Sequence, residues 1–339
     1  MNPSPATLKD VAAAAGVSVS TASRALAGNP VITEQTSERV RQCAEELNYR
    51  PNAQARALRS SRTHVIGVTI PSLVNPFFAT MAQVIQQEAT ARGLSTIISS
   101  TAEDPGQLNA SLDVLATQRV DGILAVPYNG SEASFERLRK ARIPVVLLDR
   151  ELPATGLSTV ASDPRPGMDA AVAHLLANGH RHIGYLSGPM TTSTGVSRLA
   201  AFQAACERHG VEKREIYRGG YERADGHAGT LTLLDRGVEA IIAGDTMMSV
   251  GALEACHARK VIIGRDLAFI GYDDNVTLRL QASPVSVIDQ DVATLGRTGL
   301  RLLVDLMSGA SPPTTVTTPT TLIIRPSSDF IRPADEVRT

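Results

Sequence analysis

The sequence contains no tryptophan, few aromatic residues and only three cysteines. Aromatic residues make up 4% of the 339 positions, so the cores must consist mainly of Ala, Val, Leu and Ile, as in layered α/β folds. Cys43, Cys206 and Cys256 are too far apart for the paired spacing of a zinc site or a disulfide framework. We expect three buried, reduced thiols, and neither a metal nor another cofactor.

The sequence also lacks long apolar segments and enzyme motifs. No stretch approaches the roughly 20 apolar residues that cross a bilayer, and the N-terminus lacks the basic-then-apolar pattern of a signal peptide. These absences predict a cytoplasmic protein that does not contact a membrane. Neither a phosphate-binding G-x-x-x-x-G-K-S/T loop nor a nucleophile elbow occurs, which argues against an enzyme.

Positive charge is concentrated near the N-terminus, although the net charge of the whole chain is only −1. The first 64 residues contain eight Lys or Arg and five Asp or Glu, a net charge of +3, and the remainder carries −4. Four arginines and no acidic residue lie from Arg50 to Arg62. Such a segment suits contact with a polyanion, but a solvated linker has the same composition.

Helical periodicity predicts three short helices before this basic segment. Apolar residues recur on one face over residues 8–15, and Gly16 can end that helix. Ser18 is a suitable N-cap for a second helix, and a third is expected over about residues 33–47. Three short helices around a small core are typical of a helix-turn-helix domain, although other helical hairpins share the pattern.

The second of these helices has an outer side that suits the DNA major groove. Its outward positions carry Val19, Ser20, Ser23 and Arg24. The guanidinium of Arg24 can donate two hydrogen bonds to a guanine. Hydroxyl groups can reach phosphates from Ser18, Thr21 and Ser23. The sequence therefore predicts that this helix reads bases.

Two segments of the N-terminal region resemble the lactose-repressor (LacI/GalR) family of bacterial transcription regulators, namely "TLKDVAAAAGVSVSTASRALAG" and "NYRPNAQARALRSSRTHVIGV". The resemblance extends over residues 7 to about 328. The family's base-reading positions correspond to Val19, Ser20 and Arg24. Its positions that contact the DNA backbone correspond to Thr7, Ser18, Thr21, Ser23, Tyr49 and Asn52. Ala22 stands where the family usually has valine, which trims the small core without changing the reading surface.

The basic segment is expected to be a hinge that becomes ordered on DNA. Pro51 can open a helix, but one this short is marginal in water and should form only against DNA and a second copy of the chain. Leu58 matches a leucine that the family wedges into the minor groove, where it would unstack a base step and bend the duplex. The alternative for Leu58 is packing on the neighbouring domain. Arg56 and Arg59 would reach phosphates or the groove.

Short apolar runs alternate with helical stretches from Val65 onward, which is the pattern of doubly wound α/β lobes. The expected fold is a small all-α helix-turn-helix head followed by a two-lobed core like that of periplasmic binding proteins, with two doubly wound parallel sheets. The expected domains are the head in 1–49, the hinge in 50–62 and the core in 63–339. The expected lobes are an N-lobe at about 63–161 and 291–320 and a C-lobe at about 162–290 and 321–330.

Ligands of such lobes bind beyond the carboxyl ends of the strands, so residues that follow the apolar runs are candidate contacts. These residues are Asn75, Phe77, Phe78, Asp149, Arg150, Arg198, Tyr221, Gly244, Asp245, Asp273 and Gln290. Asp163 and Asp274 occupy similar places but are expected to be structural. Carboxylates and guanidinium groups can pair with the neighbouring hydroxyls of a sugar, while aromatic faces cover its apolar sides. The set therefore predicts a polyol ligand.

The cleft is also similar to that of periplasmic ribose-binding proteins. The positions whose counterparts bind the pentose are Asn75, Phe77, Phe78, Asp149, Arg150, Arg198, Asp273 and Gln290. Tyr221 replaces a phenylalanine, whereas Gly244 and Val126 replace two asparagines. The two lost asparagines remove hydrogen-bond partners and add space. Besides ribose or another pentose, we therefore expect a ribonucleoside as a candidate ligand, with its base near Gly244 and Tyr221.

A transcription regulator, with a repressor as our expectation, accounts for the head, the basic hinge and the sugar-like cleft together. A transport-type sugar-binding protein would not need residues 1–62, and a sugar-processing enzyme with a DNA-binding head would need a phosphate-binding loop. The resemblance implies a homodimer on a pseudo-palindromic, double-stranded DNA operator. The C-terminus has no apolar heptads, so no tetramerising coiled coil is expected. Ligand-induced closure of the lobes is expected to release the operator.

Overall fold

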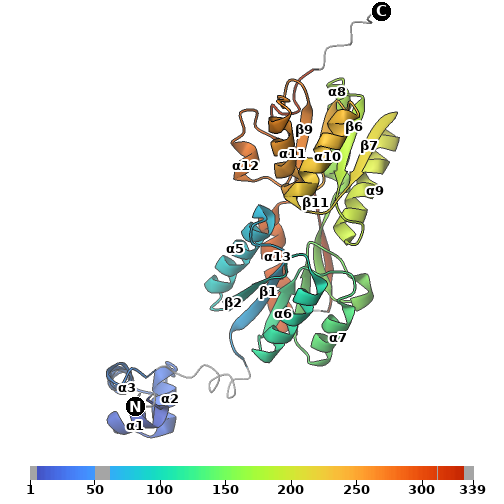
Figure 1. Cartoon of the computed structure of the whole chain (residues 1–339). Helices are drawn as coiled ribbons and strands as arrows, with labels where there is room; N and C mark the ends of the chain where they lie inside the picture. The colour runs from blue at the N-terminus through green and yellow to red at the C-terminus, as the bar shows by residue number, and fades with distance from the viewer. Residues whose placement is uncertain (1–5, 50–61, 311, 332–339) are drawn as a thin grey trace, which may run out of the picture. The chain divides into compact units, whose positions relative to one another are not determined.

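The computed structural model describes residues 6–49, 62–310 and 312–331 (Figure 1). The chain forms two compact units, Met1–Thr63 and His64–Thr339. Four residues expected to contact DNA lie outside the described residues: Asn52, Arg56, Leu58 and Arg59.

Residues 6–49, the part of the N-terminal unit that the structure describes continuously, contain three helices around a core of small side chains. They are α1 (Leu8–Ala14), α2 (Val19–Leu26) and α3 (Glu34–Glu46), and they confirm the predicted three-helix head. Side chains cap the start of each helix, from Thr7, Ser18 and Thr33 respectively. The core consists of Val11, Ala12, Ala15, Ala22, Ala25, Val40 and Ala44. Its alanines let α1 and α2 pack closely, so few bulky residues are needed.

The N-lobe of the second unit is a six-stranded sheet with helices on both faces. The strand order is β11-β5-β4-β3-β1-β2. The strands are β1 (Val65–Ile70), β2 (Ser95–Ser100), β3 (Gly122–Ala125), β4 (Val145–Leu148), β5 (Ser158–Asp163) and β11 (Thr315–Pro319). The helices on one face are α5 (Pro76–Ala91) and α13 (Val292–Met307), and those on the other are α6 (Pro105–Thr117) and α7 (Glu132–Lys140). A short 3-10 helix, η1 (Pro153–Thr155), connects β4 to β5.

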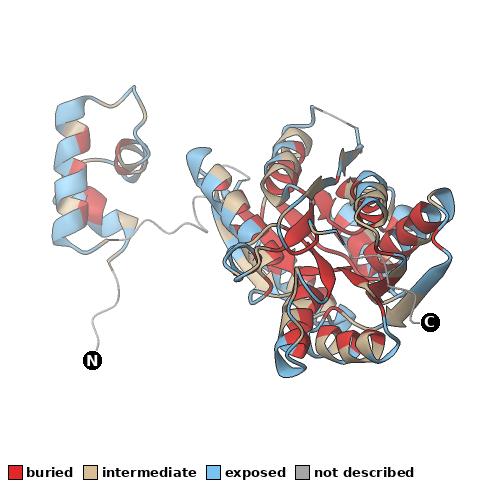
Figure 2. Cartoon of the chain, turned by 90° about the horizontal axis from the view of Figure 1, so that it is seen from above, coloured by how far each residue is buried: buried red, intermediate tan, exposed pale blue. Residues whose placement is uncertain are grey.

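The C-lobe repeats this three-layer arrangement, with the strand order β12-β10-β9-β8-β6-β7. The strands are β6 (His182–Ser187), β7 (Lys213–Arg218), β8 (Ala240–Ala243), β9 (Ala268–Tyr272), β10 (Ser286–Asp289) and β12 (Thr321–Ile323). The helices on one face are α8 (Arg165–Ala177) and α9 (Ser193–Arg208), and those on the other are α10 (Arg223–Asp235) and α11 (Thr246–Ala258), with the short α12 (Val276–Arg279) after β9. Figure 2 shows that buried residues gather on the strands while the outer faces of the helices are exposed.

The chain passes between the lobes after β5, after β10 and after β11. The strand pairs are parallel apart from β10 and β12, which are antiparallel. The prediction of two parallel sheets is therefore wrong for β12. Thr320 alone separates β11 from β12, so the chain has no room to reverse. It enters the second sheet against the direction of that sheet's other strands.

The three cysteines differ in burial. Cys206 and Cys256 are free and buried, and burial raises their thiol pKa values to about 11 and about 12, so both stay protonated. The expectation is wrong for Cys43, which is only partly buried because the small head does not enclose that side of α3. Within the described ranges, no helix is long and apolar enough to span a membrane.

Candidate functional site

The outer side of α2 presents the candidate base-reading residues of the N-terminal unit. Val19, Ser20 and Arg24 are exposed there, and Thr21 and Ser23 are partly buried beside them. The Ser18 hydroxyl caps the helix by accepting from the Thr21 N–H at 3.0 Å, and it lies 2.8 Å from the Ser20 hydroxyl. Val19 and Ser20 thus lie at the start of the helix, the part that contacts base edges when such a helix enters a major groove, and Arg24 lies in its last turn.

Two candidate backbone contacts lie at the ends of helices in the same unit. Thr7 is exposed and forms a capping box with Asp10 at the start of α1. Tyr49 follows α3, is partly buried and packs against the small core. Contacts of this kind to phosphates orient a reading helix without themselves reading sequence.

The second candidate site lies where the carboxyl ends of the two sheets meet. Asp149 follows β4 and Asp273 follows β9, which is the fourth strand of each lobe in chain order. Their φ angles are +62° and +63°, in the left-handed region that residues other than glycine seldom adopt. Both side chains are buried, as are those of Arg150, Arg198 and Gln290. The lobes thus contribute equivalent carboxylates, each held by a strained backbone, to one cleft.

A continuous set of polar contacts connects the carboxylates of the two lobes. Arg198 on α9 lies 3.6 Å from Asp149 Oδ1 and donates to Gln290 Oε1 at 3.0 Å. Gln290 Nε2 in turn donates to Asp273 Oδ1 at 2.6 Å. Arg198 also donates to the Gly244 carbonyl at 2.9 Å. Arg198 is therefore the cation that joins the two carboxylates across the cleft.

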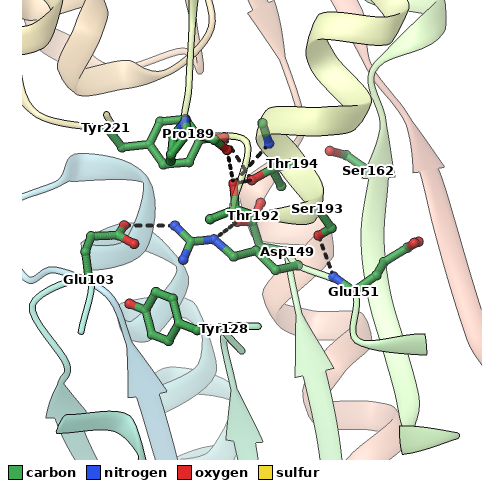
Figure 3. Close-up of polar contacts among 12 residues, drawn as sticks. Glu103, Tyr128, Asp149, Glu151, Ser162, Pro189, Thr192, Ser193, Thr194 and Tyr221 are labelled. Atoms are coloured by element: carbon green, nitrogen blue, oxygen red, sulfur yellow. Dashed lines mark hydrogen bonds and ion pairs between the residues drawn. The ribbon is translucent and has the colours of Figure 1, made fainter. Parts of the chain in front are cut away.

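Arg150 lies between Tyr128 of the N-lobe and Tyr221 of the C-lobe. Its guanidinium carbon is 4.9 Å from the Tyr128 ring centre and 5.6 Å from the Tyr221 ring centre, within the range of cation–π attraction. The guanidinium donates to Glu103 Oε1 at 2.8 Å. Figure 3 shows Glu103, Tyr128 and Tyr221 gathered around this point. Tyr221 donates in turn to Thr194 Oγ1 at 2.9 Å, which holds its ring in place.

Several buried polar atoms of the cleft have no hydrogen-bond partner among the described residues. They are Nε and Nη1 of Arg150, Oδ1 of Asp149 and the hydroxyl groups of Tyr185 and Tyr272. Buried polar groups are almost always paired, because an unpaired one costs about 1–3 kcal/mol. The cleft therefore holds hydrogen-bond donors and acceptors that are free to pair with a ligand, and a ligand that carries both kinds of group would satisfy them.

Burial changes the protonation of the carboxyl groups in the cleft. Desolvation raises the pKa of Asp273 to about 7 and that of Asp245 to about 6, and the positive charge of Arg198 opposes both shifts. Desolvation also raises the pKa of Asp149, although Arg198 lies beside it. The cleft thus contains carboxyl groups that change charge near neutral pH.

A cavity of about 250 Å³ adjoins Asp149 between the lobes. Residues of both lobes line it, among them Ser162 of the N-lobe and Thr194 of the C-lobe. At its edge the Glu151 N–H donates to Ser193 Oγ at 2.8 Å, which ties the lobes together (Figure 3). Asp149 thus belongs both to the polar set and to the lining of this cavity.

The remaining N-lobe candidates lie at the start of α5. Asn75 caps this helix by accepting from the Phe77 N–H at 3.0 Å. Phe77 and Phe78 contact each other edge to face and pack in the N-lobe core. All three follow β1 at the same sheet edge as Asp149. In this structure their contacts are those of helix capping and core packing.

The extra space expected at Val126 and Gly244 is absent. Val126 is fully buried among the apolar side chains of the N-lobe core. A Cβ atom at Gly244 would lie 2.6 Å from the Leu186 carbonyl oxygen and 2.8 Å from the Tyr185 hydroxyl oxygen. Glycine is needed there because β6 approaches closely, while the placement of a base near Gly244 stays a prediction.

Asp163 and Asp274, which were expected to be structural, each form an ion pair with an arginine that does not belong to the polar contacts of the cleft. Asp163 lies 2.7 Å from Arg165, and Asp274 lies 2.9 Å from Arg325. These ion pairs stabilise the C-lobe and the segment that enters it from the N-lobe.

Sequence reasoning missed several residues of the cleft: Glu103, Tyr128, Thr246 and Tyr272. Glu103 follows β2 and Tyr128 follows β3, so the strand-end rule applied consistently finds both. Thr246 donates to Asp273 Oδ2 at 2.6 Å from the start of α11. Tyr272 is the last residue of β9, and the sequence carries no signal that its ring lies 4.3 Å from the Arg198 guanidinium carbon.

Two family models match the chain. The model described as "Bacterial regulatory proteins, lacI family" matches residues 7–52, and "Periplasmic binding protein-like domain" matches residues 172–328. The HTH-type transcriptional repressor PurR of Mannheimia succiniciproducens is 31% identical over 303 residues, which cover 88% of this chain and 91% of that protein. The ribose operon repressor of Escherichia coli is 31% identical over 305 residues, which cover 88% of this chain and 92% of that protein.

Solved structures share the fold. A probable LacI family transcriptional regulator from Corynebacterium glutamicum is 43% identical with a TM-score of 0.74, over 79% of this chain and 100% of that chain. The lac repressor dimer bound to operator and the anti-inducer ONPF is 26% identical with a TM-score of 0.85, over 96% of this chain and 99% of that chain.

Proposed function

Because the chain belongs to the LacI family of bacterial transcription regulators, we propose that the ligand controlling its affinity for operator DNA is a ribosyl compound, either a pentose such as D-ribose or a ribonucleoside. The chain is a DNA-binding repressor regulated by a small ligand and is not an enzyme. The observation that carries the proposal is a group of buried polar atoms that have no hydrogen-bond partner among the described residues, namely Arg150 Nε and Nη1 and Asp149 Oδ1.

These groups suit the neighbouring hydroxyls of a sugar ring. Asp149 and Asp273 can accept from hydroxyl groups, and Arg150 can donate to them. The rings of Tyr128 and Tyr221 offer apolar faces beside the same point. A ligand that lacks a hydroxyl would leave one of these buried groups unpaired, which gives selectivity. The ribose operon repressor of Escherichia coli is 31% identical, as is the repressor PurR of Mannheimia succiniciproducens, so these identities do not choose between the candidate ligands.

The close approach of β6 to Gly244 favours the pentose over the ribonucleoside. The Tyr185 hydroxyl and the Leu186 carbonyl fill the space at Gly244 in which a base was expected. D-ribose is therefore the first candidate.

We also propose that the protein is a homodimer on a pseudo-palindromic operator. Large apolar side chains are exposed before α5 and around α12, namely Leu73, Val74, Val276 and Leu280. The helices α5 and α12 lie on the same side of the two lobes in Figure 1, where a second copy would cover them.

In this proposal the contacts to DNA divide into three groups. Bases are read by Val19, Ser20 and Arg24. The DNA backbone is contacted by Thr7, Ser18, Thr21, Ser23, Tyr49 and Asn52. The hinge contributes Arg56, Leu58 and Arg59. The ligand releases the operator because it binds the closed arrangement of the lobes more tightly than the DNA-bound arrangement.

Isothermal calorimetry of the full chain with D-ribose, uridine, adenosine and a set of hexoses tests the proposed ligand. We expect D-ribose to bind, and Arg198→Ala or Asp273→Ala to abolish its binding, because each change leaves buried partners unpaired. The matched control is Arg208→Ala, at an exposed position of the same helix α9, which should bind like the parent. Tight binding of a hexose with no affinity for any ribosyl compound would contradict the proposal.

A further inference from the structure

Acidic side chains outnumber basic ones around the cleft, although burial raises the pKa values of Asp245 and Asp273 to about 6 and about 7, so Asp273 is only partly ionised at neutral pH. The carboxyl groups are those of Glu103, Asp149, Asp245 and Asp273, and the guanidinium groups are those of Arg150 and Arg198. Glu151 and Asp163 line the adjoining cavity, and Arg165, which lines it as well, is paired with Asp163. A ligand therefore meets more carboxyl groups than cations.

Both guanidinium groups of the cleft are already neutralised. Arg150 Nη2 is 2.8 Å from Glu103 Oε1, and its Nε is 4.0 Å from Asp149 Oδ2. Arg198 is 3.6 Å from Asp149 Oδ1. An anion that approached the unpaired Nε of Arg150 would also approach the Asp149 carboxylate. At this level of burial the repulsion is poorly screened, so it offsets the attraction of the arginine.

Carboxylates occupy two of the helix N-termini at this edge, those of α6 and α11, whereas the uncharged side chains of Asn75 and Thr192 cap α5 and α9. Asp104 Oδ1 accepts from the Gln107 N–H at 2.6 Å at the start of α6, and Asp245 Oδ1 accepts from the Met247 N–H at 2.6 Å at the start of α11. Helix N-termini commonly bind phosphate groups, because their N–H groups and the helix dipole favour an anion. At α6 and α11 the carboxylates of Asp104 and Asp245 already hold those positions.

We propose that the cleft admits uncharged ligands and rejects phosphate esters, so that the repressor responds to a free sugar or nucleoside and not to its phosphorylated product. This inference rests on the proposed function, because it concerns the same cleft. A phosphate dianion in this cleft would find no cation that is not already paired with a carboxyl group. Burying an unpaired charge is costly, so the phosphate ester is excluded from the cleft. The ligand is then the substrate of a reaction that transfers a phosphoryl group to it, and the phosphorylated product of that reaction does not bind.

Calorimetry with three matched pairs tests this inference on the full chain. The pairs are D-ribose and D-ribose 5-phosphate, adenosine and adenosine 5′-monophosphate, and D-glucose and D-glucose 6-phosphate. For the parent compound that binds, we expect the phosphate ester to bind at least about 100-fold more weakly. D-ribose 5-phosphate binding as tightly as D-ribose would overturn the inference and leave the ribosyl ligand standing.

The other outcomes separate the two proposals. Binding of D-glucose but of neither ribosyl parent, with its phosphate ester rejected, would overturn the ribosyl ligand and support the exclusion of charge. If none of the three parents binds, both proposals are overturned.

A charge variant tests the cause of the selectivity. In Glu103→Gln one carboxylate is lost while an amide oxygen remains to accept from Arg150, so the ratio of ester to parent dissociation constants should fall by about tenfold. The control is Glu212→Gln, an exposed residue just before β7 at the opposite edge of the C-lobe sheet, in which the ratio should not change. If Glu103→Gln fails to fold by circular dichroism, Asp245→Asn takes its place. An unchanged ratio in a folded cleft variant would overturn the inference.

Discussion

Replacing Arg198 with alanine should destabilise the protein far more than the same change at an exposed arginine. Arg198 is only 5% exposed, lies 3.6 Å from Asp149 Oδ1 and donates to Gln290 Oε1 at 3.0 Å. Removing one partner of a buried ion pair costs about 3–5 kcal/mol, because the other charge stays buried without compensation. We therefore expect the free energy of unfolding at neutral pH to fall by about this amount in Arg198→Ala.

Urea unfolding of the full chain, followed by far-ultraviolet circular dichroism, measures this loss. The matched control is Arg208→Ala on the same helix, since Arg208 is exposed and pairs with Asp169 at 2.6 Å. Exposed ion pairs contribute at most about 1 kcal/mol. If the two variants lose the same free energy of unfolding, the reasoning about Arg198 is refuted.

The loss should also depend on pH in a definite direction. Burial raises the pKa of Asp273 to about 7, and Arg198 limits that rise. A carboxyl group with a higher pKa in the folded state binds more protons when folded, so its contribution to stability is lost as the pH rises from about 4 to about 7. Without Arg198 this pKa rises further. Below about pH 6 Asp273 is protonated in both folded proteins, so the difference between Arg198→Ala and the parent should be constant there and should grow as the pH rises through about 7. A difference that stays constant across pH 7 would contradict this cause.

Three further predictions concern DNA, assembly and ligand. Arg24→Ala should weaken operator binding by about 1–3 kcal/mol and relax the preference at one base pair of each half-site, and Leu58→Ala should reduce the bend and the affinity. If both variants bind operator DNA as tightly as the parent at the same salt concentration, the proposed docking of α2 and the hinge on DNA is excluded. Sedimentation should give a dimer of twice 35.9 kDa, and a stable monomer or a tetramer would contradict it. Calorimetry should show D-ribose binding more tightly as the pH rises through about 7, because its hydroxyls donate best to an ionised Asp273, whose pKa is about 7. An affinity that does not change with pH would remove Asp273 from the contacts.

The sequence by itself determined the features that depend on near neighbours along the chain. The helices of the head follow from caps and apolar faces that span a few residues, as at Thr7, Ser18 and Thr33. The alternation of short apolar runs and helical stretches likewise determined two α/β lobes. It also identified the sheet edge that holds Asp149 and Asp273, because parallel strands bring their carboxyl ends together.

Only the tertiary structure decided which side chains meet at that edge. Glu103 binds Arg150 across 47 positions of sequence, and Tyr128 and Tyr221 approach the same guanidinium from different lobes. Gly244 indicated open space in the sequence, yet β6 fills it. The strand-end rule identifies an edge of each sheet. The neighbours at that edge depend on how two sheets and their helices pack at near-crystalline density, which is set by side-chain volumes far apart in the chain.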